Sequence, residues 1–124
     1  MAYLIVFLGG GTGAALRHAV NVAAARLMGS GFPFGTLCVN VTGSLVMGLL
    51  AGYFAFRGDV SQGWRLFLMT GILGGYTTFS AFSLDAVVLW ERGAWGPALV
   101  YVFGSVAISI LGLLAGLALV RSLV

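Results

Sequence analysis

The strongest constraint on this chain is the length of its uncharged apolar stretches. No charged residue occurs from Gly35 to Phe56 or from Gly93 to Val120. Each stretch is longer than the roughly 20 residues that a helix needs to cross the hydrocarbon core of a bilayer. Only 7% of all residues are charged, whereas about a quarter are charged in a typical soluble domain. The sequence therefore predicts an all-α membrane protein.

Four predicted transmembrane helices account for almost the whole chain, at about residues 3–26, 35–56, 65–90 and 96–120. The connections between them are too short to form a second domain, so residues 1–124 are expected to form one four-helix transmembrane domain. A closed barrel would instead need alternating segments of about ten residues. The first stretch has no basic region before its apolar run, which favours a retained helix over a signal peptide. We expect a multi-pass protein of the cell (inner or plasma) membrane.

The arginines are divided evenly between the two sides of the predicted bundle. The two sets are Arg57, Arg65 and Arg121 on the side of the termini, and Arg26, Arg92 and a snorkelling Arg17 on the other side. The positive-inside rule needs an excess of Lys and Arg on one side to set the orientation, and no excess exists here. The balance indicates insertion in both orientations, which permits an antiparallel dimer.

One segment inside the third span conflicts with a continuous helix. It reads GGYTTFSAF, from Gly74 to Phe82, between strongly apolar flanks. Glycine costs about 1 kcal/mol relative to alanine in a helix, and threonine and serine are also unfavourable there. A helix in a membrane can break only where protein, ion or water satisfies the freed backbone groups. We predict a break from Gly74 to Thr78, whose unwound carbonyls suit a monovalent cation, as in transporters with discontinuous helices.

Polar side chains within the spans offer donors to a small anion. Asn40 provides an amide, and Tyr101, Ser105 and Ser109 follow one another at four-residue spacing. This spacing places the three hydroxyls on one helix face. For Asn40, hydrogen bonding between helices is an alternative interpretation, and a packing face would explain two of the three hydroxyls.

Two aromatic residues and one charge complete the set of candidate residues. Phe79 and Phe82 lie beside the predicted break, and aromatic rings have positive edges that can solvate an anion. Simple packing remains open for both rings. Arg17 lies within the first span, where a charge usually faces a partner, a cavity or a pathway. It either attracts anions at an aqueous vestibule or extends its charged group to the membrane surface.

The sequence contains no arrangement typical of catalysis, metal chelation or nucleic-acid recognition. The only histidine, His18, has no acidic neighbour along the chain, and Asp59, Asp85 and Glu91 lie at or near predicted span ends. The arginines are scattered and do not form the basic stripe of a nucleic-acid-binding protein. A single cysteine, Cys38, excludes an intrachain disulfide. We expect neither an enzyme nor a nucleic-acid-binding protein.

Three motifs resemble the signature stretches of the CrcB/Fluc family of fluoride channels: GGGTGAALR, GTLCVNVTGS and GILGGYTTFSAFS. The resemblance covers essentially the whole chain. It implies an antiparallel, dual-topology homodimer with two pathways, through which fluoride leaves the cytoplasm so that its toxicity is reduced. Matched to the motifs, the fluoride pathway consists of Asn40, Phe79, Ser80, Phe82, Tyr101, Ser105 and Ser109.

The same resemblance implies a structural sodium ion at the centre of the dimer interface. Backbone carbonyls of Gly74 and Thr77 from both subunits would coordinate it, and Arg17 matches the family's first-helix arginine near a vestibule. The implied partners are fluoride, sodium, a second copy of the chain and the lipid bilayer.

Two other classes of protein are the alternatives. A small multidrug-type transporter is also a four-helix, dual-topology dimer, but it needs a membrane-embedded carboxylate in its first helix, and none occurs from Ala2 to Arg26. A structural assembly subunit would use the small residues at one-turn spacing for packing. In that case the broken third helix and the aligned hydroxyls would have no function.

Overall fold

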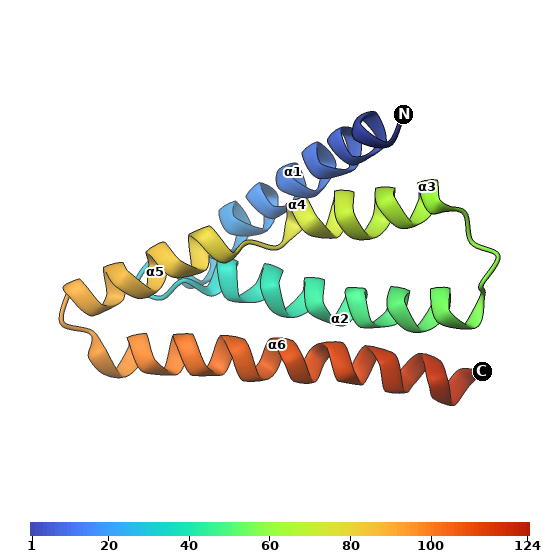
Figure 1. Cartoon of the computed structure of the whole chain (residues 1–124). Coiled ribbons are helices and arrows are strands. Elements are labelled where there is room, and N and C mark those ends of the chain that lie inside the picture. Colours follow the sequence, from blue (N-terminus) through green and yellow to red (C-terminus); the bar gives the residue numbers. More distant parts are fainter.

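The computed structural model describes all 124 residues, and every regular element in it is helical (Figure 1). The elements in chain order are α1 (Ala2–Met28), α2 (Phe34–Phe56), α3 (Gln62–Arg65), η1 (Leu66–Leu73), α4 (Gly74–Tyr76), α5 (Phe79–Glu91) and α6 (Trp95–Leu123). The η1 segment is a π-helix, and α3, η1, α4 and α5 together form the interrupted third span. The all-α prediction is confirmed.

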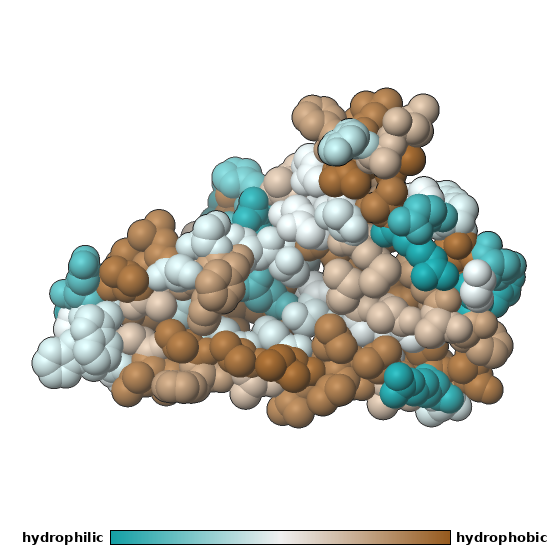
Figure 2. Space-filling view, in the orientation of Figure 1, coloured by the Kyte–Doolittle hydropathy of each residue, from teal (hydrophilic) through white to brown (hydrophobic).

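Three helical segments are long and apolar enough to cross a membrane: Phe34–Phe56, Gln62–Glu91 and Trp95–Leu123. Only 19 of the 124 residues are buried within the protomer, and many large apolar side chains are exposed. Figure 2 shows these apolar side chains as a nearly continuous surface along α6. Such a surface is stable in contact with lipid or with another protein chain, so the chain is a multi-pass membrane protein.

The helices pack in two pairs. α2 lies along α6, and α1 lies along η1 and α4. Both chain termini and the α2–α3 connection are at one end of the molecule, and the α1–α2 and α5–α6 connections are at the other (Figure 1). This arrangement places Arg57, Arg65 and Arg121 at one end and Arg26 and Arg92 at the other, whereas Arg17 lies in the interior of α1.

Glycines permit the closest helix contacts. A Cβ atom at Gly13 of α1 would overlap the carbonyl oxygen of Ile72, and one at Gly75 would overlap that of Gly10. Between α2 and α6, a Cβ at Gly48 would overlap the carbonyl oxygen of Leu113. Association of helices in lipid depends on such close backbone packing, because burial of apolar surface provides no driving force there.

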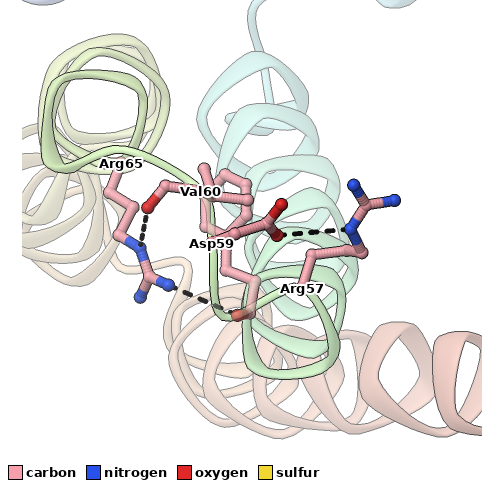
Figure 3. A network of polar contacts seen from close by, with 5 residues as sticks. Arg57, Asp59, Val60 and Arg65 are labelled. Atoms are coloured by element: carbon pink, nitrogen blue, oxygen red, sulfur yellow. Dashed lines mark hydrogen bonds and ion pairs between the residues drawn. The ribbon is translucent and has the colours of Figure 1, made fainter.

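Arg65 organises the short connection between α2 and α3 (Figure 3). Its Nη2 donates to the carbonyl oxygen of Phe54 at 3.3 Å, and its Nε donates to that of Val60 at 3.4 Å. The bond to Phe54 satisfies a carbonyl at the C-terminal end of α2, where no intrahelical donor remains. Arg57 forms an exposed ion pair with Asp59 at 3.3 Å, and the hydrogen bond from Arg57 lowers the pKa of the Asp59 carboxyl group.

Candidate functional site

The interruption of the third span is shorter than the sequence predicted. Gly74 has helical backbone angles (φ −63°, ψ −37°), whereas Thr77 and Thr78 are extended, with ψ values of 158° and 123°. The prediction that the break begins at Gly74 is therefore wrong, because the helix continues to Tyr76. Gly75 lies within this helical part, where it allows contact with the α1 backbone.

Asn40 of α2 completes the hydrogen bonding of the break. Its Oδ1 accepts from the backbone N–H of Thr78 at 2.8 Å, and its Nδ2 donates to the carbonyl oxygen of the same residue at 3.0 Å. One side chain thus satisfies both backbone groups of an extended residue in the membrane, as the absence of water requires. The amide nitrogen has two hydrogens, so one N–H remains for a further acceptor.

Thr78 also begins α5. Its Oγ1 accepts from the backbone N–H of Ala81 at 3.1 Å, as in an N-cap. The hydroxyl of Ser80 lies 3.3 Å from the same oxygen. The first turn of α5 carries the partial positive charge of a helix N-terminus, and this turn includes Phe79.

Backbone oxygens next to the break lack donors. The Thr77 N–H and its Oγ1 both donate to the carbonyl oxygen of Leu73, each at 3.0 Å. No side chain and no turn or cap N–H donates to the carbonyl oxygens of Gly74 or Thr77. These two oxygens are therefore free to accept a hydrogen bond from another chain or from water, or to coordinate a cation.

A groove of about 380 Å³ runs beside the break, between α2, α5 and α6. It brings together five of the seven residues predicted for the pathway: Asn40, Phe79, Phe82, Ser105 and Ser109. Ser105 is 4% exposed, and its Oγ is the one buried side-chain polar atom without a hydrogen-bond partner. A buried hydroxyl without a partner costs free energy, so an acceptor that reached this atom would stabilise it.

The two predicted phenylalanines differ in their surroundings. The Phe79 side chain is 77% exposed, whereas Phe82 is 9% exposed and buried in the aromatic layer between α5 and α6. The Phe82 ring centre lies 5.6 Å from that of Phe79 and 5.2 Å from that of Tyr101. Phe82 is held on both sides, while Phe79 is free on the outer face of the protomer.

Two predicted pathway residues lie outside the groove lining. Ser80 is exposed. Tyr101 is 1% exposed and lies behind Phe82, where its hydroxyl donates to Oδ2 of Asp85 at 3.1 Å. Asp85 lies within α5, six residues before Glu91, and lines a depression together with residues of the α1–α2 connection. Its spacing of three from Phe82 is the sequence signal that places both residues on one helix face.

Arg17 is separate from this groove. It is half-buried on α1 and forms no ion pair or hydrogen bond within the protomer. Its charge is available to a second chain, to an ion or to the membrane surface.

Interrupted helices form the sites of substrates and ions in many membrane transporters. The family described as "CrcB-like protein, Camphor Resistance (CrcB)" matches residues 4–117, and the chain belongs to this family. A protein of Rhodopseudomonas palustris (strain BisB5) named fluoride-specific ion channel FluC is 66% identical over 123 residues, covering 99% of each chain. A Nitrobacter hamburgensis protein named fluoride-specific ion channel FluC 2 is 64% identical, also over 99% of each chain.

Proposed function

We propose that this protein is a fluoride-specific ion channel that lets fluoride leave the cytoplasm and so reduces its toxicity. The carrying observation is the groove beside the break, which Ser105, with its unpartnered hydroxyl, lines together with Asn40, Phe79 and Phe82. The names of relatives 64 to 66% identical over nearly the whole chain support the same function.

The groove suits fluoride because it offers donors and no fixed negative charge. Fluoride is small and strongly hydrated, so a pathway must replace its water with other donors. Ser105, Ser109 and the remaining N–H of Asn40 supply hydrogen bonds, and the edges of Phe79 and Phe82 supply partial positive charge. The free end of α5 adds the positive end of a helix dipole. Chloride is larger and fits less well between closely spaced rings.

Ser80, Tyr101 and Arg17 complete the proposed pathway outside the groove. Ser80 lies one residue from Phe79 at the start of α5. Tyr101 acts on the pathway indirectly, because its ring packs against Phe82 and so fixes the position of that ring. Its hydroxyl donates a hydrogen bond to Asp85. Arg17 attracts anions at the vestibule.

The working unit that we propose is an antiparallel homodimer with four transmembrane helices in each copy, α1 included, and one domain formed by residues 1–124. The groove is open on the protomer surface, and Phe79 at its edge is exposed, so a second copy would close it. Fusions of a reporter to the C-terminus test the topology: signal from both sides of the membrane is expected, and signal from one side only would contradict the dual arrangement.

We further propose that sodium lies at the centre of this dimer. The residues present suit the ion, because the carbonyl oxygens of Gly74 and Thr77 have no donor within the protomer. Gly74 is exposed, and a Cβ there would meet only the Met69 carbonyl oxygen, at 3.7 Å. Nothing within the protomer requires glycine at this position, which supports the approach of a second chain.

The chain is a channel and not an enzyme, and its carboxylates do not suit a proton-coupled transporter. Such a transporter would use a carboxylate in α1, where none is present. Asp85 lies inside a span, but it lies on α5 and accepts a hydrogen bond from Tyr101. A protein that couples protons to drug export would expose this group to its substrate.

Efflux from liposomes tests the function. Purified protein is reconstituted into vesicles loaded with potassium fluoride or potassium chloride, and valinomycin is added to carry the compensating charge. We expect rapid fluoride release at an ion-selective electrode and little chloride release. Equal release of both ions, or release of neither, would contradict a fluoride-specific channel, and proton-dependent export of a cationic dye would favour the transporter.

A further inference from the structure

The break in the third span is tied to α2 at a second point besides Asn40. The hydroxyl oxygens of Thr42 and Tyr76 lie 2.9 Å apart. Thr42 donates its own proton to the carbonyl oxygen of Cys38 at 2.7 Å. A hydroxyl has one proton to donate, so Tyr76 is the donor in the contact with Thr42. Neither residue belongs to the groove or to the proposed sodium site.

The hydrogen bonds of Asn40 and Thr42 hold the break from different faces of α2. Asn40 and Thr42 are two residues apart, which separates them by about 200° around a helix. Asn40 lines the groove, whereas Thr42 and Tyr76 line a separate apolar depression. Gly43, the residue after Thr42, faces the break directly. A Cβ at Gly43 would overlap Cγ2 of Thr77, so the absence of a side chain there leaves space for that methyl group.

We propose that the Thr42–Tyr76 hydrogen bond is a positioning latch for the ion pathway. It fixes the last helical residue before the break, while Asn40 fixes Thr78 after it. The Thr77 peptide between these two points is then held in a single extended conformation. The latch thereby orients the Thr77 carbonyl and the start of α5, including the Phe79 ring. Its effect on flux rests on the proposed channel function, whereas its effect on local order does not.

The chemistry of the pair predicts an asymmetry between its two members. In Tyr76→Phe the ring remains and Thr42 still bonds to Cys38, so only the latch is lost. In Thr42→Val the Tyr76 hydroxyl stays in apolar surroundings without a partner. Leaving one polar group unpaired costs more free energy than removing both partners of a hydrogen bond. The double variant should therefore resemble Tyr76→Phe, and Thr42→Ser should resemble the wild type because it keeps the hydroxyl.

Amide hydrogen exchange, measured by mass spectrometry on purified protein, reads the latch directly. In Tyr76→Phe we expect roughly five-fold faster exchange in peptides covering residues 74–80, the effect of one net hydrogen bond on local opening. Thr42→Val should exchange faster still. Peptides from α6 should be unchanged, because α6 contributes no residue to the depression that Thr42 and Tyr76 line.

Two matched controls separate the latch from general effects of the substitutions. Tyr53→Phe removes a tyrosine hydroxyl that has no partner. Thr12→Val removes a hydroxyl that bonds to the carbonyl oxygen of Leu8, as Thr42 bonds to Cys38, but has no second partner. Both controls should leave the exchange of residues 74–80 at the wild-type rate.

Fluoride flux at equal dimer content completes the test. We expect flux to fall severalfold in Tyr76→Phe and Thr42→Val and to recover in Thr42→Ser. Wild-type exchange of residues 74–80 in Tyr76→Phe would overturn the latch, and so would a uniform increase of exchange across the protein. An absence of fluoride flux through the wild-type protein would refute the proposed channel function but not the latch, because hydrogen exchange tests the latch independently of flux.

Discussion

The two halves of the interrupted third span are held by different kinds of contact. The first half, η1 and α4, packs on α1 backbone to backbone through glycines such as Gly71 and Gly75. The second half, α5, packs on α6 through side chains, with Phe82 and Leu89 buried against Ala98 and Tyr101. The extended residues of the break join the two halves.

This difference separates a structural region from a functional one. Backbone contacts leave no room for a side chain at Gly71 and Gly75, so these two positions can accept almost no change. Side-chain contacts define the shape and chemistry of a surface, and in the second half that surface is the groove beside Phe79 and Phe82. Substitutions at the glycines that contact α1 should therefore affect folding, and substitutions at the groove residues of the second half should affect conduction at constant folding.

The largest expected effect is that of Gly75→Ala. The added methyl group would overlap the Gly10 carbonyl oxygen, and neither helix backbone can yield locally. We expect the free energy of unfolding to fall by about 3 kcal/mol or more, which is at or above the upper end of the usual range for overpacked cores. Little folded dimer should then appear in size-exclusion chromatography.

Gly11→Ala is the matched control for this substitution. A Cβ at Gly11 meets no atom within 4 Å, and alanine favours a helix over glycine by about 1 kcal/mol. Gly11→Ala should fold at least as well as the wild type within the protomer. Equal dimer yields from the two alanine variants would show that the glycine contact does not determine the fold.

Phe82→Ile should have the next largest effect, on flux and not on folding. Isoleucine keeps an apolar side chain in the layer but removes the ring edge from the groove. We expect fluoride efflux to fall by at least roughly tenfold, which corresponds to a barrier higher by about 1.4 kcal/mol. Phe79→Met should be milder, because the polarisable thioether is flexible and the site is exposed. Wild-type flux through folded Phe82→Ile dimers would show that this ring only packs.

A smaller effect is expected at the junction of the two halves. Gly74→Val should leave the protomer folded, because the site is open, but should weaken the proposed dimer, in which the second copy and a sodium ion would lie against Gly74. Thr77→Ser keeps the carbonyl and the hydroxyl, and should leave dimer stability and its sodium dependence nearly unchanged. Thermal unfolding with and without sodium provides the measurement. A dimer insensitive to sodium and to Gly74→Val would remove the cation from this site.

The helical segments were predictable from sequence because a membrane leaves few alternatives. Long uncharged stretches must form helices there, and the observed bounds lie within three residues of the predicted ones. The residues of the groove were predictable because Ser105 and Ser109 share a helix face and Phe79 and Phe82 follow the break. Both signals are local in the sequence.

Contacts between distant segments were not predictable in the same way. The sequence shows that Asn40 carries a side-chain amide, but only the fold shows that this amide bonds to both backbone groups of Thr78. The pairing of Asp85 with Tyr101 depends on how α5 meets α6. The π-helical turns of η1 have no sequence signal that we recognise. The length of the break was overestimated because Gly74 and Gly75 were interpreted as helix breakers, whereas both are helical and Gly75 is needed for packing against α1.

The most direct test of the proposed pathway is the fluoride flux of Ser105→Ala. The Ser105 hydroxyl is buried without a partner, so its removal should leave the thermal stability of the dimer unchanged or slightly higher. If the hydroxyl binds the ion, the loss of one hydrogen bond to a charged group, ~1.5–3 kcal/mol, should slow fluoride efflux by roughly tenfold or more. Ser122→Ala, at the far end of α6, should conduct as the wild type does. Unchanged efflux through a stable Ser105→Ala dimer would contradict a fluoride pathway along this groove.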